Sequence, residues 1–204
     1  MPDETYMRRS AALLKGYFSN PLPGNNGIGI GVDYGLTLKP SGKGYRNHRG
    51  VDMHAPMISG RDRIYAPANG RVVHAGWLNR YYGNVVKIRH VIGGCTVWTI
   101  MAHCRLVIVH NGQSVQRDQY IALEGSSGNS HGAHVHFEIR AHRDDRDHTI
   151  DPVPTFRSPP RPLFYSGAHR RIRLPSQAEL DKIINEVKQE MLKQQRLDLD
   201  AIEI

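Results

Sequence analysis

The middle of the chain, from about residue 45 to residue 140, is a series of short apolar runs separated by glycines. These runs are rich in β-branched and aromatic residues, and they cover residues 71–75, 84–90, 96–103, 120–123 and 134–140. Short runs with glycine-rich turns and almost no helical periodicity favour an all-β core. Connections this short favour antiparallel pairing of neighbouring strands. We therefore predict an all-β core built on an antiparallel β-sheet.

The composition changes along the chain and suggests four segments. Residues 1–44 are predicted to be an N-terminal extension, irregular apart from a short helix over residues 6–18. Residues 45–150 form the main domain, and residues 151–175 form a linker rich in proline and arginine. Residues 176–204 are predicted to form an amphipathic helix, because Ser176 and Glu179 make a capping box ahead of apolar residues at helical spacing. Its apolar face, within residues 176–197, either packs on its own domain or mediates self-association or partner docking.

Charge and targeting signals narrow the classes of function. The formal net charge of +8 favours an anionic partner, namely nucleic acid, an anionic membrane or an anionic cell-wall polymer, and is also compatible with a generally basic, solvated surface. Nucleic acid is not expected as the primary partner, because no RNA-recognition, zinc-finger or leucine-zipper pattern is present. The sequence has no apolar run approaching the roughly 20 residues of a transmembrane helix. The polar N-terminus shows no export signal, so we expect synthesis in the cytoplasm without a signal peptide.

The two cysteines, Cys95 and Cys104, flank one of the apolar runs. If that run is a single extended strand, its ends lie about 30 Å apart. A disulfide needs Cα atoms within about 7 Å of each other, so two free thiols are expected.

Histidines are numerous, with twelve in the chain, and several stand in patterns suited to metal binding. His48 and Asp52 are four residues apart, and zinc accepts both imidazole nitrogen and carboxylate oxygen. Gly50 between them is expected to let the backbone bend so that both side chains reach one ion. This pair alone is also compatible with an ordinary polar surface.

The sequence His134-Val135-His136 carries more information. On a β-strand, residues two apart point to the same face, so both imidazoles would enter one site. His103 ends another predicted strand, where its side chain can face the same cleft. Together these residues suggest zinc held by three protein ligands, with an open position for water. Two further histidines could then move a proton and stabilise the developing oxyanion.

Several motifs of this chain occur in a specific order. They are His48-x-x-x-Asp52, residues 66–73 (APANGRVV), residues 83–86 (GNVV), Ala102-His103, and His134-x-His136-Phe137-Glu138. In this order, over about residues 45–142, the chain resembles the lysostaphin-type (LytM-like) zinc metallopeptidases, metallopeptidase family twenty-three. The resemblance implies an antiparallel sheet that forms a groove, with one Zn²⁺ at its floor. It also implies hydrolysis of peptide bonds in bacterial peptidoglycan, in stems or cross-links.

The resemblance assigns roles residue by residue. His48, Asp52 and His136 would bind zinc, and His103 and His134 would be the catalytic histidines. Tyr82 and Asn84, which flank Gly83, are assigned to substrate binding. His90 is expected to make a structural hydrogen bond, and Glu138 is either an ordinary strand residue or a support for a metal ligand.

The chain departs from the family pattern at three positions. Met101 stands where an aromatic residue is usual, and Cys104 and Val135 stand where leucine is usual. We expect these changes to affect groove lining and packing, and hence substrate preference more than metal binding.

Two hypotheses about function follow. The first is a zinc endopeptidase that cuts the cell wall, as a phage lysin released through a holin or as part of a virion. The second is a non-catalytic or latent wall-binding or assembly module with the same fold, because some family members act only as activators of other hydrolases. Intact residues at all the metal and catalytic positions favour the first.

Overall fold

The computed structural model describes residues 4–23, 29–38, 45–54, 62–157 and 161–162. The chain divides into two compact units, Met1–Ser166 and Gly167–Ile204. The second unit lies outside the described residues, and so does the helix predicted over residues 176–204. The bounds of the four predicted segments remain predictions.

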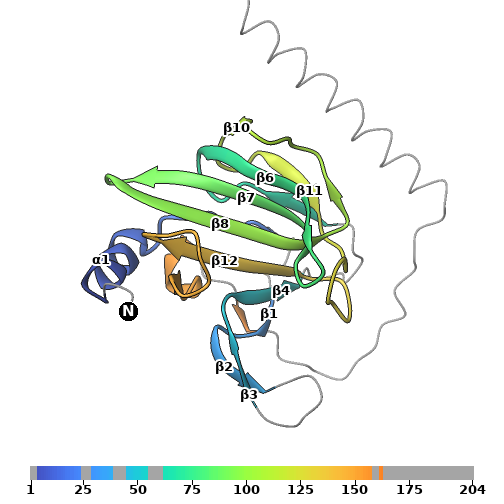
Figure 1. Cartoon of the computed structure of the whole chain (residues 1–204), viewed down its shortest axis with the longest axis horizontal. Coiled ribbons are helices and arrows are strands. Elements are labelled where there is room, and N and C mark those ends of the chain that lie inside the picture. Colours follow the sequence, from blue (N-terminus) through green and yellow to red (C-terminus); the bar gives the residue numbers. More distant parts are fainter. Residues whose placement is uncertain (1–3, 24–28, 39–44, 55–61, 158–160, 163–204) are drawn as a thin grey trace, which may run out of the picture. The chain divides into compact units, whose positions relative to one another are not determined.

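The main sheet is built on four longer strands that run side by side (Figure 1). These are β6 (Gly70–Asn79), β7 (Gly83–Ile92), β8 (Cys95–Cys104) and β12 (Val135–Ala141), and each pairs antiparallel with its neighbour. The short strand β10 (Ser114–Val115) extends the sheet beyond β6. On the other side, β12 pairs with β4 (Val51–His54) and β13 (Thr149–Ile150). The predicted antiparallel β-fold is therefore confirmed.

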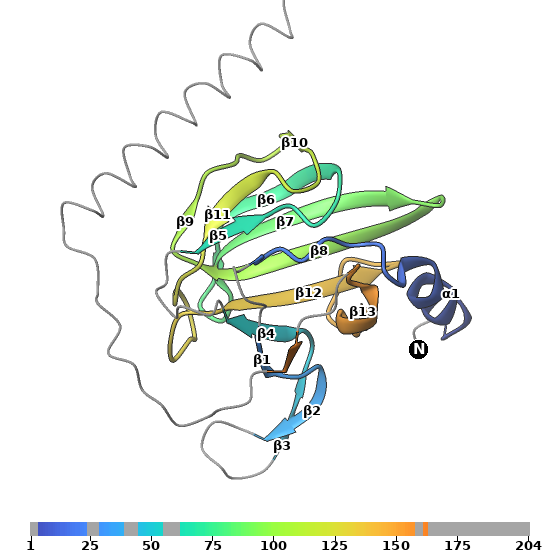
Figure 2. The ribbon, with the colours of Figure 1, turned by 180° about the vertical axis from the view of Figure 1, so that it is seen from behind.

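Smaller elements surround this sheet (Figure 2). β4 pairs with β1 (Gly29–Val32), which also pairs with β14 (Arg161–Pro162). A three-stranded sheet contains β5 (Arg63–Tyr65), β11 (Tyr120–Leu123) and β9 (Leu106–Val107), and β2 (Gly35–Leu38) pairs with β3 (Tyr45–His48). In the part of the chain that the structure describes, the helices are α1 (Glu4–Leu14) and a short 3-10 helix, η1 (Val153–Thr155). Within the described residues, no helix has the length and apolar character needed to cross a membrane.

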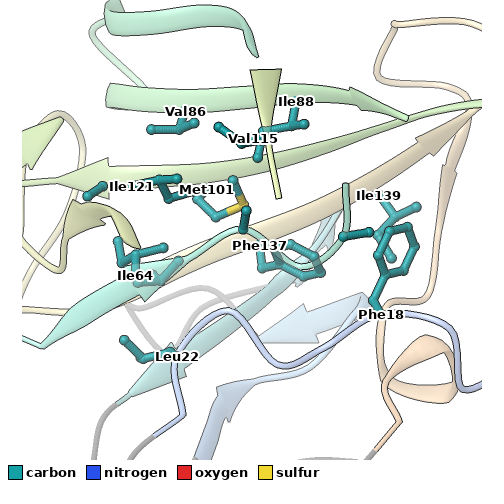
Figure 3. Packing of buried hydrophobic residues seen from close by; sticks show 14 of the residues in the cluster. Phe18, Leu22, Ile64, Val86, Ile88, Met101, Val115, Ile121, Phe137 and Ile139 are labelled. Atoms are coloured by element: carbon teal, nitrogen blue, oxygen red, sulfur yellow. The ribbon is translucent and has the colours of Figure 1, made fainter. Parts of the chain in front are cut away.

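Side-chain alternation divides the main sheet into two faces. On β12, Val135, Phe137 and Ile139 point into the hydrophobic core, where they meet Met101 of β8 and Ile88 of β7 (Figure 3). Burying a side chain of this size contributes about 1.5–3 kcal/mol. The alternate residues of the same strands lie on the opposite face, which we call the site face.

The N-terminal segment takes part in this core. Leu14, Phe18 and Leu22 are buried in the same cluster as the strand residues. The Phe18 amide donates to the carbonyl of Thr155 at 2.9 Å, and its carbonyl accepts from Arg157 at 2.8 Å. The predicted helix over residues 6–18 exists, but it ends at Leu14. Gly16 has a φ of 64°, the left-handed conformation that commonly ends a helix.

The three departures from the family pattern lie on the core face. Met101, Cys104 and Val135 are completely buried in the hydrophobic cluster. The groove-lining part of the expectation was therefore wrong. Strand alternation directs Met101 and Val135 away from the site, and Cys104 packs in the same core cluster, so the effect of all three is on packing. Cys95 and Cys104 are free thiols at opposite ends of β8, as predicted.

Candidate metal centre

The candidate centre forms where β4 and β12 pair. Asp52 lies directly opposite His136 in the antiparallel register, and His48 ends β3 just before β4 begins. Gly50 allows this close approach, because a Cβ atom there would lie 2.3 Å from the carbonyl oxygen of Phe137. A side chain at residue 50 would therefore push β4 away from β12 and separate the three side chains.

Three potential ligand atoms converge at this point. His48 Nε2 lies 3.0 Å from His136 Nδ1 and 3.1 Å from Asp52 Oδ1, and His136 Nδ1 lies 2.8 Å from the same carboxylate oxygen. All three residues are buried. Bond lengths of about 2.0–2.2 Å around a tetrahedral zinc place ligand atoms about 3.3 Å apart. The triangle is thus close to the size that zinc requires.

The outer hydrogen bonds decide which nitrogens are free to bind a metal. His48 Nδ1 lies 2.8 Å from the carbonyl oxygen of Asp33, so it carries a proton and donates. His136 Nε2 lies 3.0 Å from Glu138 Oε1 and likewise donates to an acceptor. In the neutral rings, the two nitrogens that face each other are therefore unprotonated. Together with Asp52, they place three lone-pair donors around one point, an arrangement that needs a cation at its centre.

The pKa shifts of these residues reflect the same need for positive charge. Burial lowers the pKa of His136, but hydrogen bonds to Asp52 and Glu138 outweigh it and raise the pKa to about 9. Burial raises the pKa of the Asp52 carboxyl, yet His136 and His48 bring it well below its usual value. A proton on His136 thus occupies the position that a bound metal cation would take. The residues therefore fit a zinc ion.

His103 and His134 lie beside this triangle without belonging to it. Their ring centroids are 4.6 Å apart, and His134 Nε2 lies 3.8 Å from Asp52 Oδ1. His103 Nδ1 donates to the carbonyl of Ser127 and His134 Nδ1 to the carbonyl of Gly132, each at 2.8 Å. Each ring therefore keeps its Nε2 available as a proton acceptor.

These two histidines differ electrostatically from His136. Burial, followed by the nearby His134, lowers the pKa of His103 to about 4, and burial also lowers the pKa of His134. Both rings are neutral at pH 7, which suits a group that must accept a proton.

The backbone of His103 has an unusual conformation. Its φ is 62°, in the left-handed region that few residues other than glycine adopt. Its amide donates to the carbonyl of Tyr82 at 2.9 Å, and its carbonyl accepts from Ser127 at 3.3 Å. These two bonds hold His103 between the β6–β7 turn and the loop that precedes β12.

Tyr82 ends the β6–β7 turn, and Asn84 lies at the start of β7. The Tyr82 ring centroid is 6.0 Å from that of His136. The backbone amide of Asn84 donates to Ser127 Oγ at 2.9 Å. The structure therefore places Tyr82 near the centre and joins the Asn84 backbone to the loop that precedes β12; the role of both residues in substrate binding remains a prediction.

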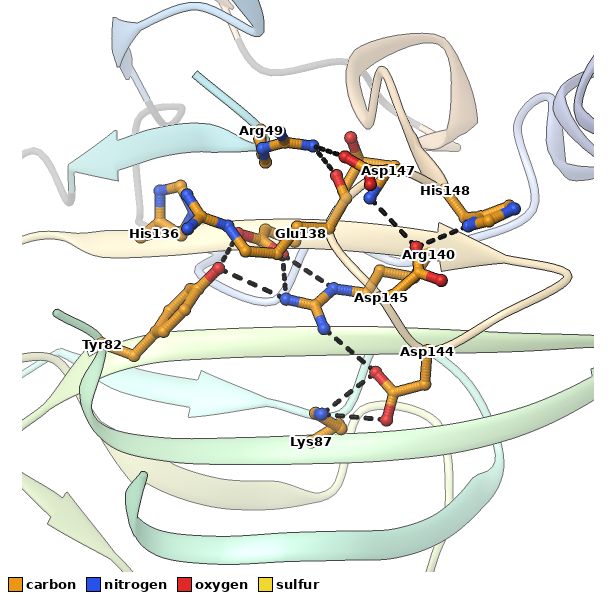
Figure 4. Close-up of polar contacts among 12 residues, drawn as sticks. Arg49, Tyr82, Lys87, His136, Glu138, Arg140, Asp144, Asp145, Asp147 and His148 are labelled. Atoms are coloured by element: carbon orange, nitrogen blue, oxygen red, sulfur yellow. Dashed lines mark hydrogen bonds and ion pairs between the residues drawn. The ribbon is translucent and has the colours of Figure 1, made fainter. Parts of the chain in front are cut away.

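A buried polar network supports His136 from behind (Figure 4). Glu138 accepts from His136, from the Tyr82 hydroxyl at 2.7 Å and from Arg140 at 2.8 and 3.0 Å. Burial raises the pKa of Glu138, but His136 and Arg140 outweigh this effect and bring it to about 2. Burial and Glu138 raise the pKa of Tyr82 to about 12. Glu138 was predicted to be either an ordinary strand residue or a support for a metal ligand. Its hydrogen bond to His136 favours the second role.

Two contributors to this centre were not predicted from the sequence. The Asp33 carbonyl was missed because a backbone acceptor leaves no sequence signal. Arg140 has a signal, since it continues the i, i+2 alternation of His136 and Glu138 along β12. His90, in contrast, was predicted correctly: it bonds to the Asn69 carbonyl and to Thr99 Oγ1, each at 2.8 Å.

Comparison with known proteins decides the family. Residues 46–152 match the model of Peptidase family M23. The chain belongs to this family. M23 proteins are a zinc-dependent family of peptidoglycan hydrolases, so the predicted resemblance is confirmed.

Individual M23 relatives differ in their described activities. The chain is 34% identical over 102 residues to the peptidoglycan DD-endopeptidase ShyA of Vibrio cholerae, a match that covers 50% of this chain and 22% of ShyA. It is 35% identical over 106 residues to the murein hydrolase activator NlpD of Escherichia coli, which covers 52% of this chain and 26% of NlpD. The chain thus spans about a quarter or less of these two relatives.

A solved structure agrees with the fold. The catalytic domain of the antimicrobial peptidase lysostaphin from Staphylococcus simulans superposes with a TM-score of 0.54 and 28% sequence identity. The match covers 66% of this chain and 95% of the lysostaphin domain.

Proposed function

We propose that this protein is a zinc-dependent endopeptidase that hydrolyses peptide bonds of bacterial peptidoglycan, in stem peptides or cross-links. The observation that carries the proposal is the triangle of His48, Asp52 and His136 beside two neutral histidines. A metal site alone needs the triangle only. The additional pair, His103 and His134, supplies the proton acceptors that peptide hydrolysis requires.

In this proposal, His48 Nε2, Asp52 Oδ1 and His136 Nδ1 hold one Zn²⁺. When bound, zinc supplies a Lewis acid that activates water and polarises the scissile carbonyl. Asp33 and Glu138 fix the tautomers of the two histidine ligands, so that the correct nitrogens face the ion.

His103 and His134 carry the proton transfer. Their Nε2 atoms are unprotonated at neutral pH, so either ring can accept the proton of the attacking water. The resulting imidazolium can then donate that proton to the leaving amine. The two ring centroids are 4.6 Å apart, so both histidines can reach the same part of a bound substrate.

Tyr82, in the β6–β7 turn, and Asn84, at the start of β7, are proposed to contact the substrate. The Tyr82 hydroxyl donates to Glu138 in this structure, and its raised pKa keeps it protonated at any physiological pH. It can therefore redirect its hydrogen to a developing oxyanion while Arg140 continues to neutralise Glu138.

The test is hydrolysis of purified peptidoglycan with and without a zinc chelator. Loss of turbidity and mass spectrometry of the released peptides measure the cleavage. We expect chelator-sensitive cleavage that falls about 10²–10⁴-fold in His103→Ala. The exposed His110 gives the matched control, because His110→Ala removes an imidazole on the surface. If zinc-loaded, folded protein cleaves no type of wall, the proposal is wrong.

The second candidate is a non-catalytic or latent wall-binding or assembly module. The similarity to NlpD, a murein hydrolase activator, favours it. Truncation near residue 157 tests this alternative, which assigns docking to the segment beyond that point. Unchanged wall binding and assembly by the truncated protein would remove its support.

The biological setting is proposed to be a phage lysin released through a holin, or a virion-associated wall hydrolase. Detection of the protein in purified particles would favour the virion setting, and its absence there would exclude that setting.

A further inference from the structure

Cross-strand register arranges the site face in rows. The first row pairs His136 with Ala102. The second runs from Glu138 through Ile100 to Lys87. Rows on one face are two residues apart, or about 7 Å along a strand. Lys87 therefore lies one row from the metal centre, although it is far from the centre in sequence.

The third row is basic. It runs across four strands through Arg140, Trp98, Arg89 and Arg71. Arg89 and Arg71 face each other directly, and both are exposed. Like charges directly opposite each other on a sheet are destabilising. An anionic ligand bound above this row would reduce that repulsion.

Lys87 of the second row and Arg140 of the third row already hold a carboxylate (Figure 4). Lys87 Nζ donates to both oxygens of Asp144, at 3.0 and 2.9 Å, and Arg140 Nη1 donates to Asp144 Oδ1 at 3.1 Å. The side chains of Lys87 and Arg140 are 12% and 7% exposed, whereas that of Asp144 is 32% exposed. Lys87 is thus neutralised by a more exposed acid on the turn between β12 and β13, and the same acid accepts a hydrogen bond from Arg140, whose other nitrogens pair with Glu138.

Arg140 links this carboxylate to Tyr82, which is proposed to contact the substrate. Arg140 Nη2 donates to the Tyr82 hydroxyl at 3.3 Å, so one guanidinium group joins Tyr82 to Asp144. An extended peptide advances about 3.3 Å per residue. A peptide bond held at the metal centre therefore places a side chain two or three residues away within reach of Lys87 and Arg140.

We propose that Lys87 and Arg140 form a carboxylate-binding subsite for an acidic group of the substrate peptide, and that Asp144 fills this subsite when substrate is absent. The nature of the peptide rests on the proposed function; the carboxylate site rests on these contacts alone. A carboxylate is favoured over a phosphate because the two cations already match the geometry of a carboxylate. Substrate entry exchanges one carboxylate for another, and the turn that carries Asp144 moves aside.

The test is equilibrium titration with two synthetic cross-linked stem peptides that contain D-alanine. One carries a free carboxylate on its diamino-acid residue, and the other carries a carboxamide there. Zinc-loaded full-length His103→Ala is used so that neither peptide is consumed. In this His103→Ala background, Asp144→Asn should tighten binding of the acid peptide about tenfold, which corresponds to about 1.4 kcal/mol. The affinity for the amide peptide should not change. Lys87→Gln should weaken binding of the acid peptide by a similar factor.

Asp147→Asn is the matched control. Asp147 lies on the same turn and bonds to Arg49 at 3.1 Å, and its side chain is 76% exposed. The ratio of acid to amide affinity should not change in this variant. Unfolding midpoints of all variants establish that each one is folded.

Three results would overturn the subsite. The first is an acid-to-amide ratio that is the same in all variants. The second is equal tightening of both peptides by Asp144→Asn, which would mean that the turn only blocks access. The third is a larger gain for inorganic phosphate or a single-stranded oligonucleotide than for the acid peptide. Failure of the proposed function would appear separately, as wild-type protein that cleaves neither peptide while the binding ratio is still measurable.

Discussion

His90 and His136 are both buried histidines of the main sheet, but their side chains lie on opposite faces. His90 lies on the core face, where its ring contacts Phe18 and its partners are the neutral Asn69 carbonyl and Thr99 hydroxyl. Burial lowers its pKa to about 4. His136 lies on the site face between two carboxylates, which raise its pKa to about 9 despite burial. Burial therefore does not fix the charge of a histidine; its hydrogen-bond partners do.

The same division applies to whole rows of the sheet. On the core face, packing stabilises the side chains, and this packing does not depend on a ligand. The site face contains buried charges that are balanced pair by pair, and its triangle of lone pairs is complete only with a cation. Substitutions on the site face should therefore mainly affect function, and substitutions on the core face should mainly affect stability, even at adjacent residues.

The largest expected effect is on the site face. His136→Ala removes one corner of the ligand triangle, so zinc binding and hydrolysis should fall to background. Metal content after dialysis and peptide release from peptidoglycan measure the two effects. Stoichiometric zinc in this variant would mean that the metal does not depend on His136. It would contradict the contrast between the site face and the core face.

The adjacent residue should behave in the opposite way. Phe137 is completely buried and packs on Phe156 with ring centroids 5.4 Å apart. Phe137→Ala should lower the free energy of unfolding by about 3–5 kcal/mol. Urea denaturation measures the loss. A change below 1 kcal/mol would show that the core face is less tightly packed than the structure indicates.

The pH dependence of stability sharpens the comparison for His90. Its folded pKa of about 4 lies below the ordinary value of 6.5, so the unfolded chain binds a proton first as pH falls. His90 therefore contributes its full stability above about pH 6.5, and about 3 kcal/mol of it is lost as pH falls to about 4. The free energy of unfolding of wild-type protein should fall more steeply over this window than that of His90→Gln. Parallel curves would contradict a neutral, buried His90.

The smallest effect is expected behind the metal ligands. Glu138→Gln keeps the size of the side chain but removes the charge that accepts the His136 proton. Zinc affinity should fall about 10–100-fold, measured by competition with a chelator. An unchanged affinity would mean that Arg140 and Tyr82, rather than His136, are the partners that Glu138 serves.

Much of the fold and of the candidate centre could be predicted from the sequence. Strand alternation in residues 134–140 was enough to place two histidines on one face, and the apolar runs gave the strands of the sheet. Phe18 and Leu22 could not be assigned to the core, because their turn-rich surroundings have no periodicity. The contact of Lys87 and Arg140 with Asp144 depends on the register of β7, β8 and β12, which no local pattern encodes. The metal and catalytic roles of the five centre residues remain predictions that the variants above test.

The left-handed backbone at His103 has a consequence for evolution. A residue with a Cβ atom costs about 1–2 kcal/mol in this conformation, a cost that glycine avoids. Drift towards stability would therefore favour glycine at position 103, and under the proposed function selection for the imidazole opposes it. Under that proposal, copies of this gene that lose activity are expected to lose this histidine early and to gain thermal tolerance as they do.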